Sequence, residues 1–253
     1  MTRSSRASWR FQLRPDLLEA QAAIDWPIEW LPDLTQRLNA WLERSITIEK
    51  RDAGENAEFD PIVAVETELL PLAFNVEVGA YINTIRSSLD MLAMSLMRRY
   101  DVPIKESQVS FPIAKDKAEF EKSELLRGLP DEPRGLMEAI RPYKEGNNLL
   151  FALHRLDILR KHRRLLKVEL RPIHMSLTGT LKPGDFEPLA TGTIQVGSET
   201  VLGLMRKGVA PTLVRSSFYV SIQEAEYLEK KPVIAVLHRL AMEAQTVINV
   251  FDF

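Results

Sequence analysis

The residues best suited to chemistry lie in one predicted helix, residues 147–166. Arg155 and His162 are seven positions apart, so they project from nearly the same side of that helix. A positioned histidine can transfer a proton, and an arginine can stabilise charge that develops on a phosphate. Four further cations form the only concentrated basic run in the chain: Arg160, Lys161, Arg163 and Arg164. The pattern offers a contact surface for an anion or a phosphate backbone.

A purely structural role explains the same residues. Cations near the C-terminus of a helix interact favourably with the helix dipole, by about 0.3–1 kcal/mol each. They also solvate a helix that is otherwise apolar, and residues 147–166 are apolar on two sides, which is typical of a central helix in a bundle. The sequence alone leaves both interpretations open.

A second polar group is predicted beside this helix. Arg86 and Asp90 are four positions apart at the flank of the apolar stripe of another predicted helix, which includes residues 79–98. Charges at the edge of a buried face must be satisfied by each other or by a neighbouring helix. Asp157 has the same i,i+4 spacing to Lys161. We predict that Arg86 and Asp90 form a buried polar network with Asp157 and His162, salt-bridged between the two helices, that fixes their register.

The histidines do not predict a metal site. His154 and Asp157 have a spacing that metal ligands use, but Lys161 shares their face and would repel a cation. The sequence has no glycine-rich phosphate loop, no H-E-x-x-H and no G-x-S-x-G motif. These absences argue against a nucleoside triphosphatase, a nicotinamide enzyme, a zinc protease and an α/β-hydrolase. We predict neither a metal nor a cofactor.

The composition is that of an ordinary soluble globular protein, with 45% hydrophobic and 27% charged residues in 253. A net charge of −2 argues against coating of nucleic acid through overall charge. The absence of cysteine excludes disulfides and thiolate chemistry. No secretory signal pattern and no run of about 20 apolar residues is present, so we expect a cytoplasmic protein without membrane contact.

The apolar spacing predicts a single α+β domain over residues 1–253, a helical bundle core with a small antiparallel β-sheet appendage. The helical core comprises approximately residues 72–166 and 232–251, and the β segments approximately 46–68 and 167–223, with strands near 168–177, 191–196 and 212–222. Another helix is expected to begin at Pro32-Asp33. Three tryptophans are expected to form a packed cluster: Trp26, Trp30 and Trp41.

Residues 101–146 are rich in proline and in charges of alternating sign, which favours a solvated surface. Short helices are predicted at residues 115–122 and 131–140. Ser110-Phe111-Pro112-Ile113 is expected to anchor this region against the bundle through its apolar side chains.

Several short motifs resemble a widespread group of uncharacterised bacterial proteins. They are Ile85-Arg86-Ser87-Ser88-Leu89-Asp90 with Leu92-Ala93, then Phe111-Pro112-Ile113, Arg141-Pro142-Tyr143, and Leu156-Asp157 with Lys161-His162-Arg163. In that group a helix of the form L-R-S-x-L-D-H-L-A precedes a helix that ends D-K-H-R. The resemblance covers roughly residues 75–170. This chain departs from it at Met91, where a histidine is expected, and would have lost one partner if that position worked with His162.

A looser resemblance is to the HEPN superfamily of helical bundles, which includes metal-independent RNases and their inactive relatives. Its signature is an arginine, four to six residues, and a histidine, which Arg155 and His162 match. The residue after the arginine is often polar in active members, whereas this chain has Leu156 there. The resemblance implies a homodimer in which His162 is the general acid or base and Arg155 stabilises charge on the phosphate. Arg160, Arg163 and Arg164 would position RNA. We prefer the other hypothesis, a non-catalytic interaction or scaffold protein.

Overall fold

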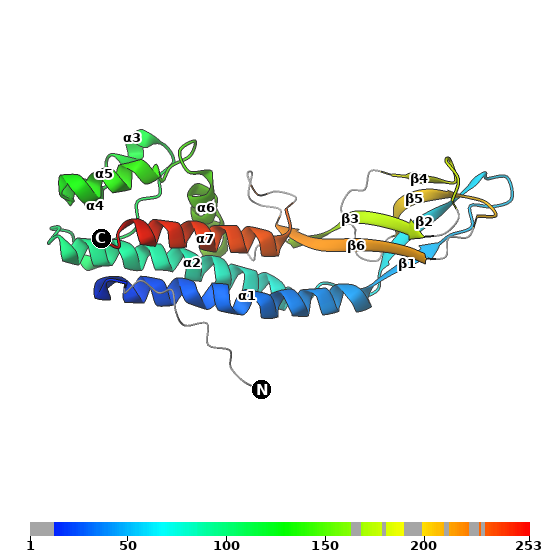
Figure 1. The fold of residues 1–253 in the computed structure, drawn as a ribbon, viewed down its shortest axis with the longest axis horizontal. Helices are drawn as coiled ribbons and strands as arrows, with labels where there is room; N and C mark the ends of the chain where they lie inside the picture. Colours follow the sequence, from blue (N-terminus) through cyan, green and yellow to red (C-terminus); the bar gives the residue numbers. More distant parts are fainter. Residues whose placement is uncertain are drawn as a thin grey trace, which may run out of the picture. The chain divides into compact units, whose positions relative to one another are not determined.

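The structure is a computed structural model that describes residues 13–162, 168–178, 181–189, 199–209, 213–222, 228 and 231–253. Helices and antiparallel strands are both present, which confirms the α+β class (Figure 1). The chain divides into two compact units. The helical unit comprises residues 1–30, 80–162 and 237–253, and the mixed unit comprises residues 31–79 and 163–236. The prediction of a single domain stays a prediction.

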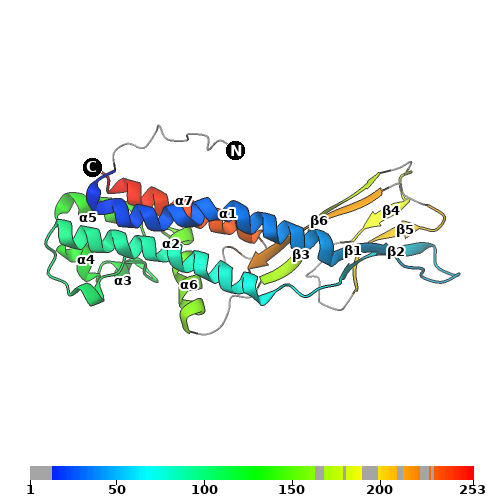
Figure 2. The same cartoon turned by 90° about the horizontal axis from the view of Figure 1, so that it is seen from below.

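Three long helices each contribute part of their length to the helical unit. They are α1 (Leu18–Ser45), α2 (Leu72–Arg99) and α7 (Val233–Val250). Figures 1 and 2 show α2 and α7 side by side, next to the first part of α1. The apolar stripe predicted on α2 is fully buried, at Ile82, Ile85, Leu89, Leu92 and Leu96. The sequence predicts a second stripe on α7 at three- and four-residue steps, which is buried as well: Val233, Leu237, Leu240, Ala244, Val247 and Phe251.

The predicted start of the first helix at Pro32 is wrong. α1 begins at Leu18, after the short 3-10 helix η1 (Pro15–Leu17), and continues through Pro27 and Pro32. A proline inside a helix removes one hydrogen bond and crowds the preceding turn, at about 3 kcal/mol. Here the apolar positions on both sides of the prolines lie on one buried face, including Ile24, Leu31 and Leu34. Packing of that face offsets the local cost.

The predicted tryptophan cluster is also wrong in part. Trp41 is completely buried, whereas Trp26 and Trp30 are 42% and 50% exposed. The ring of Trp26 contacts Tyr81 of α2, with 5.2 Å between centroids.

Shorter helices complete the helical unit: η2 (Glu106–Gln108), α3 (Lys117–Phe120), α4 (Glu124–Gly128), α5 (Asp131–Ile140) and α6 (Asn148–His162). The sequence predicted α5 and α6 and placed a helix over α3. Side chains cap three of them. Asp116 Oδ1 accepts from Glu119 N at 2.8 Å, Ser123 Oγ accepts from Leu126 N at 3.4 Å, and Asn147 Oδ1 accepts from Leu150 N at 3.1 Å. Figure 1 shows α3, α4 and α5 gathered at the end where the C-terminus lies.

The mixed unit contains two antiparallel sheets. One has the order β1-β2-β5-β4, formed by β1 (Ile46–Lys50), β2 (Phe59–Glu66), β5 (Glu199–Arg206) and β4 (Phe186–Pro188). The other pairs β3 (Val168–Thr178) with β6 (Leu213–Ile222). The β segments predicted at residues 46–68, where β1 and β2 pair as a hairpin, and the strands near 168–177 and 212–222 are confirmed. β4 and β5 were not predicted, and the strand expected at 191–196 lies outside the described residues.

In the described part of the chain, one helix, α7, is long and apolar enough to cross a bilayer by length and composition alone. The core helix of a soluble protein meets the same criterion, and the predicted stripe of α7 is buried. A cytoplasmic location without membrane contact stays a prediction.

Candidate functional site

The predicted Arg86–Asp90 pair is present on α2. Arg86 is 5% exposed, and its Nη1 donates a hydrogen bond to Asp90 Oδ1 at 2.6 Å. Its Nη2 donates to the carbonyl oxygen of Phe111 at 3.0 Å. Asp90 Oδ1 also accepts from the Phe111 backbone N–H at 2.9 Å. The pair therefore satisfies both backbone polar groups of one residue in a distant segment.

That segment is the anchor expected from the sequence. Phe111 and Ile113 are 1% and 7% exposed, so their side chains are buried as predicted. A backbone hydrogen bond of 2.9 Å from Ala114 N to the Pro142 carbonyl continues the attachment. Tyr143, which follows, packs its ring against Phe120 of α3 at 5.7 Å between centroids. The Arg86–Asp90, Phe111-Pro112-Ile113 and Pro142-Tyr143 motifs thus meet at residues 109–114.

A second polar group lies on α6. Asp157 is 3% exposed, and its Oδ2 lies 2.6 Å from Lys161 Nζ. Its Oδ1 lies 3.6 Å from Arg160 Nε, too far for a hydrogen bond, and both atoms are buried without one. Arg160 Nη2 donates to Asn83 Oδ1 of α2 at 2.5 Å, which links the two helices. The charge of Asp157 is therefore balanced by cations of its own helix.

Among the described residues the predicted network forms two separate groups. Arg86 and Asp90 bond to each other and to Phe111, and neither is salt-bridged to the described part of α6. The described link between α2 and α6 runs through Arg160 and Asn83. The part of the network assigned to His162 stays a prediction, because that side chain lies outside the described residues.

His154 lies beside both groups. Its pKa is lowered below 6.5, first by burial and then by the positive charge of Arg86, while Asp157 and Asp90 partly oppose the shift. The imidazole is therefore neutral at pH 7. The sequence offers His154 only as a possible metal ligand. In the described residues, no group of three His, Cys, Asp or Glu side chains could hold a metal ion.

The candidate catalytic residues are described only in part. Arg155 is exposed and makes no ion pair with any residue that the structure describes. His162 is the last residue of α6, and its side chain lies outside the described residues, as do Arg163 and Arg164. Of the predicted anion-binding cations, Arg160 and Lys161 are paired with Asp157. The geometry of the Arg155–His162 pair stays a prediction.

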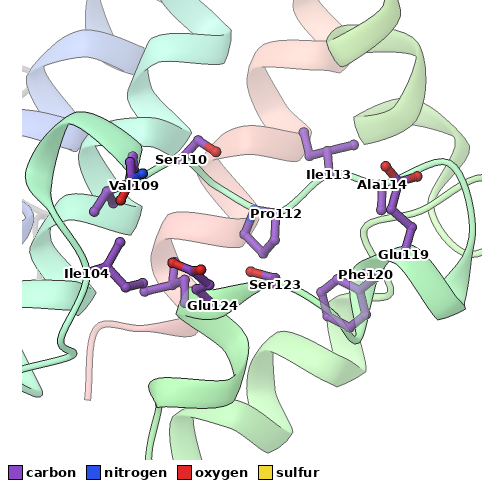
Figure 3. Close-up of a pocket in the computed structure, with 12 residues that line it drawn as sticks. Ile104, Val109, Ser110, Pro112, Ile113, Ala114, Glu119, Phe120, Ser123 and Glu124 are labelled. Carbon is purple, nitrogen blue, oxygen red and sulfur yellow. The ribbon is translucent and has the colours of Figure 1, made fainter.

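A pocket of about 390 Å³ lies in the region that we expected to be only solvated surface. Its walls are formed by η2, residues 109–114, α3 and the start of α4 (Figure 3). Its floor consists of buried apolar side chains, Ile113, Ala114, Phe120 and Leu125. Its rim consists of exposed polar side chains, Gln108, Ser110, Glu119 and Glu124. The Arg86–Asp90 pair holds Phe111, and therefore positions one wall of this pocket.

Sequence reasoning missed the pocket because its apolar floor is distributed over three short segments. The available signal was the spacing of Phe111, Ile113, Phe120 and Leu125 among charged residues. In comparisons with known proteins, no protein family, curated protein or solved structure matches the chain. The assignment of the site therefore rests on its residues alone.

Proposed function

We propose that the protein is a non-catalytic interaction protein, in which the polar residues of α2 and α6 have a structural role and the pocket beside residues 109–114 is the recognition site. The observation that supports this most directly is the fixed partnership of Arg86, which is 5% exposed and bonded to Asp90 and to Phe111. A guanidinium so placed organises the chain and is not accessible to a substrate.

The charges of α6 support the same proposal. A phosphate backbone is bound by cations that can give up water and counterions. Arg160 and Lys161 are already engaged with Asp157, whose carboxylate is 3% exposed. Moving either cation to a phosphate would leave a buried carboxylate without full compensation. Because Lys161 and Arg160 are 42% and 28% exposed, the cost lies between the about 0.3–0.5 kcal/mol of an exposed pair and the about 3–5 kcal/mol of a fully buried one. We expect RNA to compete poorly for them.

One observation favours the HEPN-like alternative. Arg155 is exposed and unpaired within the described residues, as an arginine that contacts phosphate must be. In that alternative Arg155 and His162 would cleave RNA without a metal, across a homodimer. This alternative and the non-catalytic proposal predict different results in one assay.

The assay is cleavage of mixed single-stranded RNA by purified protein in excess EDTA, with His162→Ala and Arg155→Ala beside the parent. We expect no cleavage by any of the three proteins, and a monomer by light scattering. Cleavage by the parent that both substitutions abolish, with circular dichroism unchanged, would refute the proposal and assign these residues to an RNase site. Cleavage that survives both substitutions would point to a contaminating nuclease, which ion exchange should separate from the protein.

A further inference from the structure

We infer that the pocket between η2 and α4 receives the side chain of an arginine or lysine from a partner polypeptide, with Glu124 as the partner of its charge. The inference rests on the proposed function, because it names what the recognition site binds. Three properties of the pocket lead to it: its size, the charges of its lining and its openness at the rim.

The size suits a side chain with an apolar stem. A volume of about 390 Å³ lies at the small end of the range of ligand pockets, roughly 300–1,000 Å³. Ile113, Phe120 and Leu125 give the lining its apolar part; they are 7%, 2% and 3% exposed, so the apolar area that a guest can cover is small. Long basic side chains bury their methylene stems on such surfaces and keep the charged head at the edge.

The charges of the lining select a cation. The lining contains two carboxylates and no basic side chain. Figure 3 shows Glu124 and Glu119 at opposite ends of the pocket, with Pro112 and Ser123 between them. Glu119 Oε2 already accepts a hydrogen bond of 2.9 Å from the Lys115 backbone N–H. Glu124 makes no hydrogen bond or ion pair in the part of the chain that the structure describes, so it is the carboxylate available to a guest.

The rim favours a side chain that a larger partner presents. Pockets for free small molecules usually bury 70–90% of their ligand. Gln108, Ser110 and Glu124 are exposed, so this rim is open to solvent on the side where a guest enters. An apolar floor with a polar, hydrated rim is the usual anatomy of a protein interface. A polypeptide can contact the rim while one basic side chain fills the floor.

The test is a titration of the ¹⁵N-labelled full chain, followed by the backbone amides of Ser110, Ile113, Ala114 and Ser123. The probes are acetyl-Gly-Arg-Gly-amide, the same peptide with neutral citrulline in place of arginine, and free agmatine. We expect saturable shifts with the arginine peptide, with weaker binding of citrulline and of agmatine. An exposed ion pair corresponds to about twofold to fivefold in affinity, which is the loss expected for Glu124→Gln.

Two further variants sharpen the result. Glu124→Lys should weaken binding by about tenfold, because it replaces an attraction by a repulsion. Glu138→Lys makes the same change on an exposed position of α5 outside the pocket lining and should leave binding unchanged. Glu124 also lies in the first turn of α4, where a carboxylate stabilises the helix, so the amide spectrum of each variant is compared with the parent first.

Several outcomes would overturn the inference: no saturable shift, equal binding of citrulline, or equal losses for Glu124→Lys and Glu138→Lys. Tighter binding of agmatine than of the arginine peptide would overturn the polypeptide source. These failures differ from failure of the proposed function, which RNA cleavage in EDTA would show on the same protein. A parent that neither cleaves RNA nor binds the peptide refutes the inference alone.

Discussion

We predict that the position of residues 109–114 depends on the charge of Asp90, and Asp90→Asn tests this directly. Asparagine has nearly the same shape and keeps an oxygen that can accept from the Phe111 N–H, so the substitution removes mainly the negative charge. Arg86, whose side chain is 6% exposed, would then hold its positive charge against two neutral oxygens. The perturbation isolates the electrostatic part of the pair.

The magnitude follows from the exposure of the two partners. Removing one partner of a fully buried pair costs about 3–5 kcal/mol, and exposed pairs at this spacing contribute only about 0.3–0.5 kcal/mol. Asp90 is 35% exposed and Arg86 is 6% exposed, which places the pair between these limits. We expect Asp90→Asn to lower the free energy of unfolding by about 1.5–3 kcal/mol.

The chain offers an exposed control. Asp33 and Arg37 form an Asp–Arg ion pair at the same spacing, 2.7 Å long, with side chains 50% and 45% exposed. Arg37 also bonds to Glu77, so it keeps one carboxylate partner when Asp33 is replaced. Asp33→Asn should cost about 0.5 kcal/mol or less. Both variants are unfolded in urea and followed by far-UV circular dichroism, and the exchange rate of the Phe111 amide is measured by NMR. Asp90→Asn should also accelerate that exchange, while Asp33→Asn should not.

The outcome that refutes the reasoning is equal stability of the two variants, with unchanged exchange at Phe111. A second comparison separates the ion pair from other effects of Asp90. In an Arg86→Met background, Asp90→Asn should cost less than in the parent, because no buried cation remains to be compensated. Equal costs in the two backgrounds would mean that Asp90 does not act through Arg86.

Four more substitutions test other parts of the structure. The pKa of His154 is lowered in the folded protein, so the unfolded chain binds the extra proton more readily. The contribution of His154 to the free energy of unfolding is therefore complete above about pH 6.5 and is lost as the pH falls below it. Urea titrations of His154→Gln should show a shallower loss of stability in acid than those of the parent. Gly203→Ala should destabilise by about 1–3 kcal/mol in thermal unfolding, because its Cβ would lie 2.4 Å from the Phe186 ring, and a smaller loss would show that the ring can move. Trp41→Ala should cost about 3–5 kcal/mol and Trp30→Ala under about 1 kcal/mol, since the first is fully buried and the second is half exposed; similar losses in urea would contradict this burial.

The long helices could be predicted because their signal is local. The stripes of α2 and α7 repeat every three or four residues, and each predicted position is buried. The start of α1 could not be predicted in the same way, because the cost of Pro27 and Pro32 is local while the packing that offsets it is tertiary. β4 has only three residues and includes Pro188, so it has no alternation to recognise. Local patterns predict an element only where tertiary contacts agree with them.

The candidate site divides along the same line. The i,i+4 spacing of Arg86 and Asp90 predicted their ion pair, which the structure has at 2.6 Å. Asp90 and Arg86 contact Phe111 across 21 and 25 positions of the sequence. Both contacts use the backbone groups of Phe111, which every residue possesses. The pocket floor likewise combines side chains from segments whose arrangement no spacing encodes. The sequence could therefore predict which charges pair, but not what their pairing holds in place.

The arrangement around Phe111 also shows that the identity of residue 91 does not affect the support of the pocket wall. A segment that is neither helix nor strand has backbone groups that must find partners elsewhere once buried. Arg86 and Asp90 supply one donor and one acceptor from the same face of α2, which meets this requirement at Phe111. Position 91 lies about 100° further around that helix, and Met91 is 39% exposed. The side chain at position 91 therefore lies off the face that carries the pair, and either a methionine or a histidine there leaves the support of the pocket wall intact.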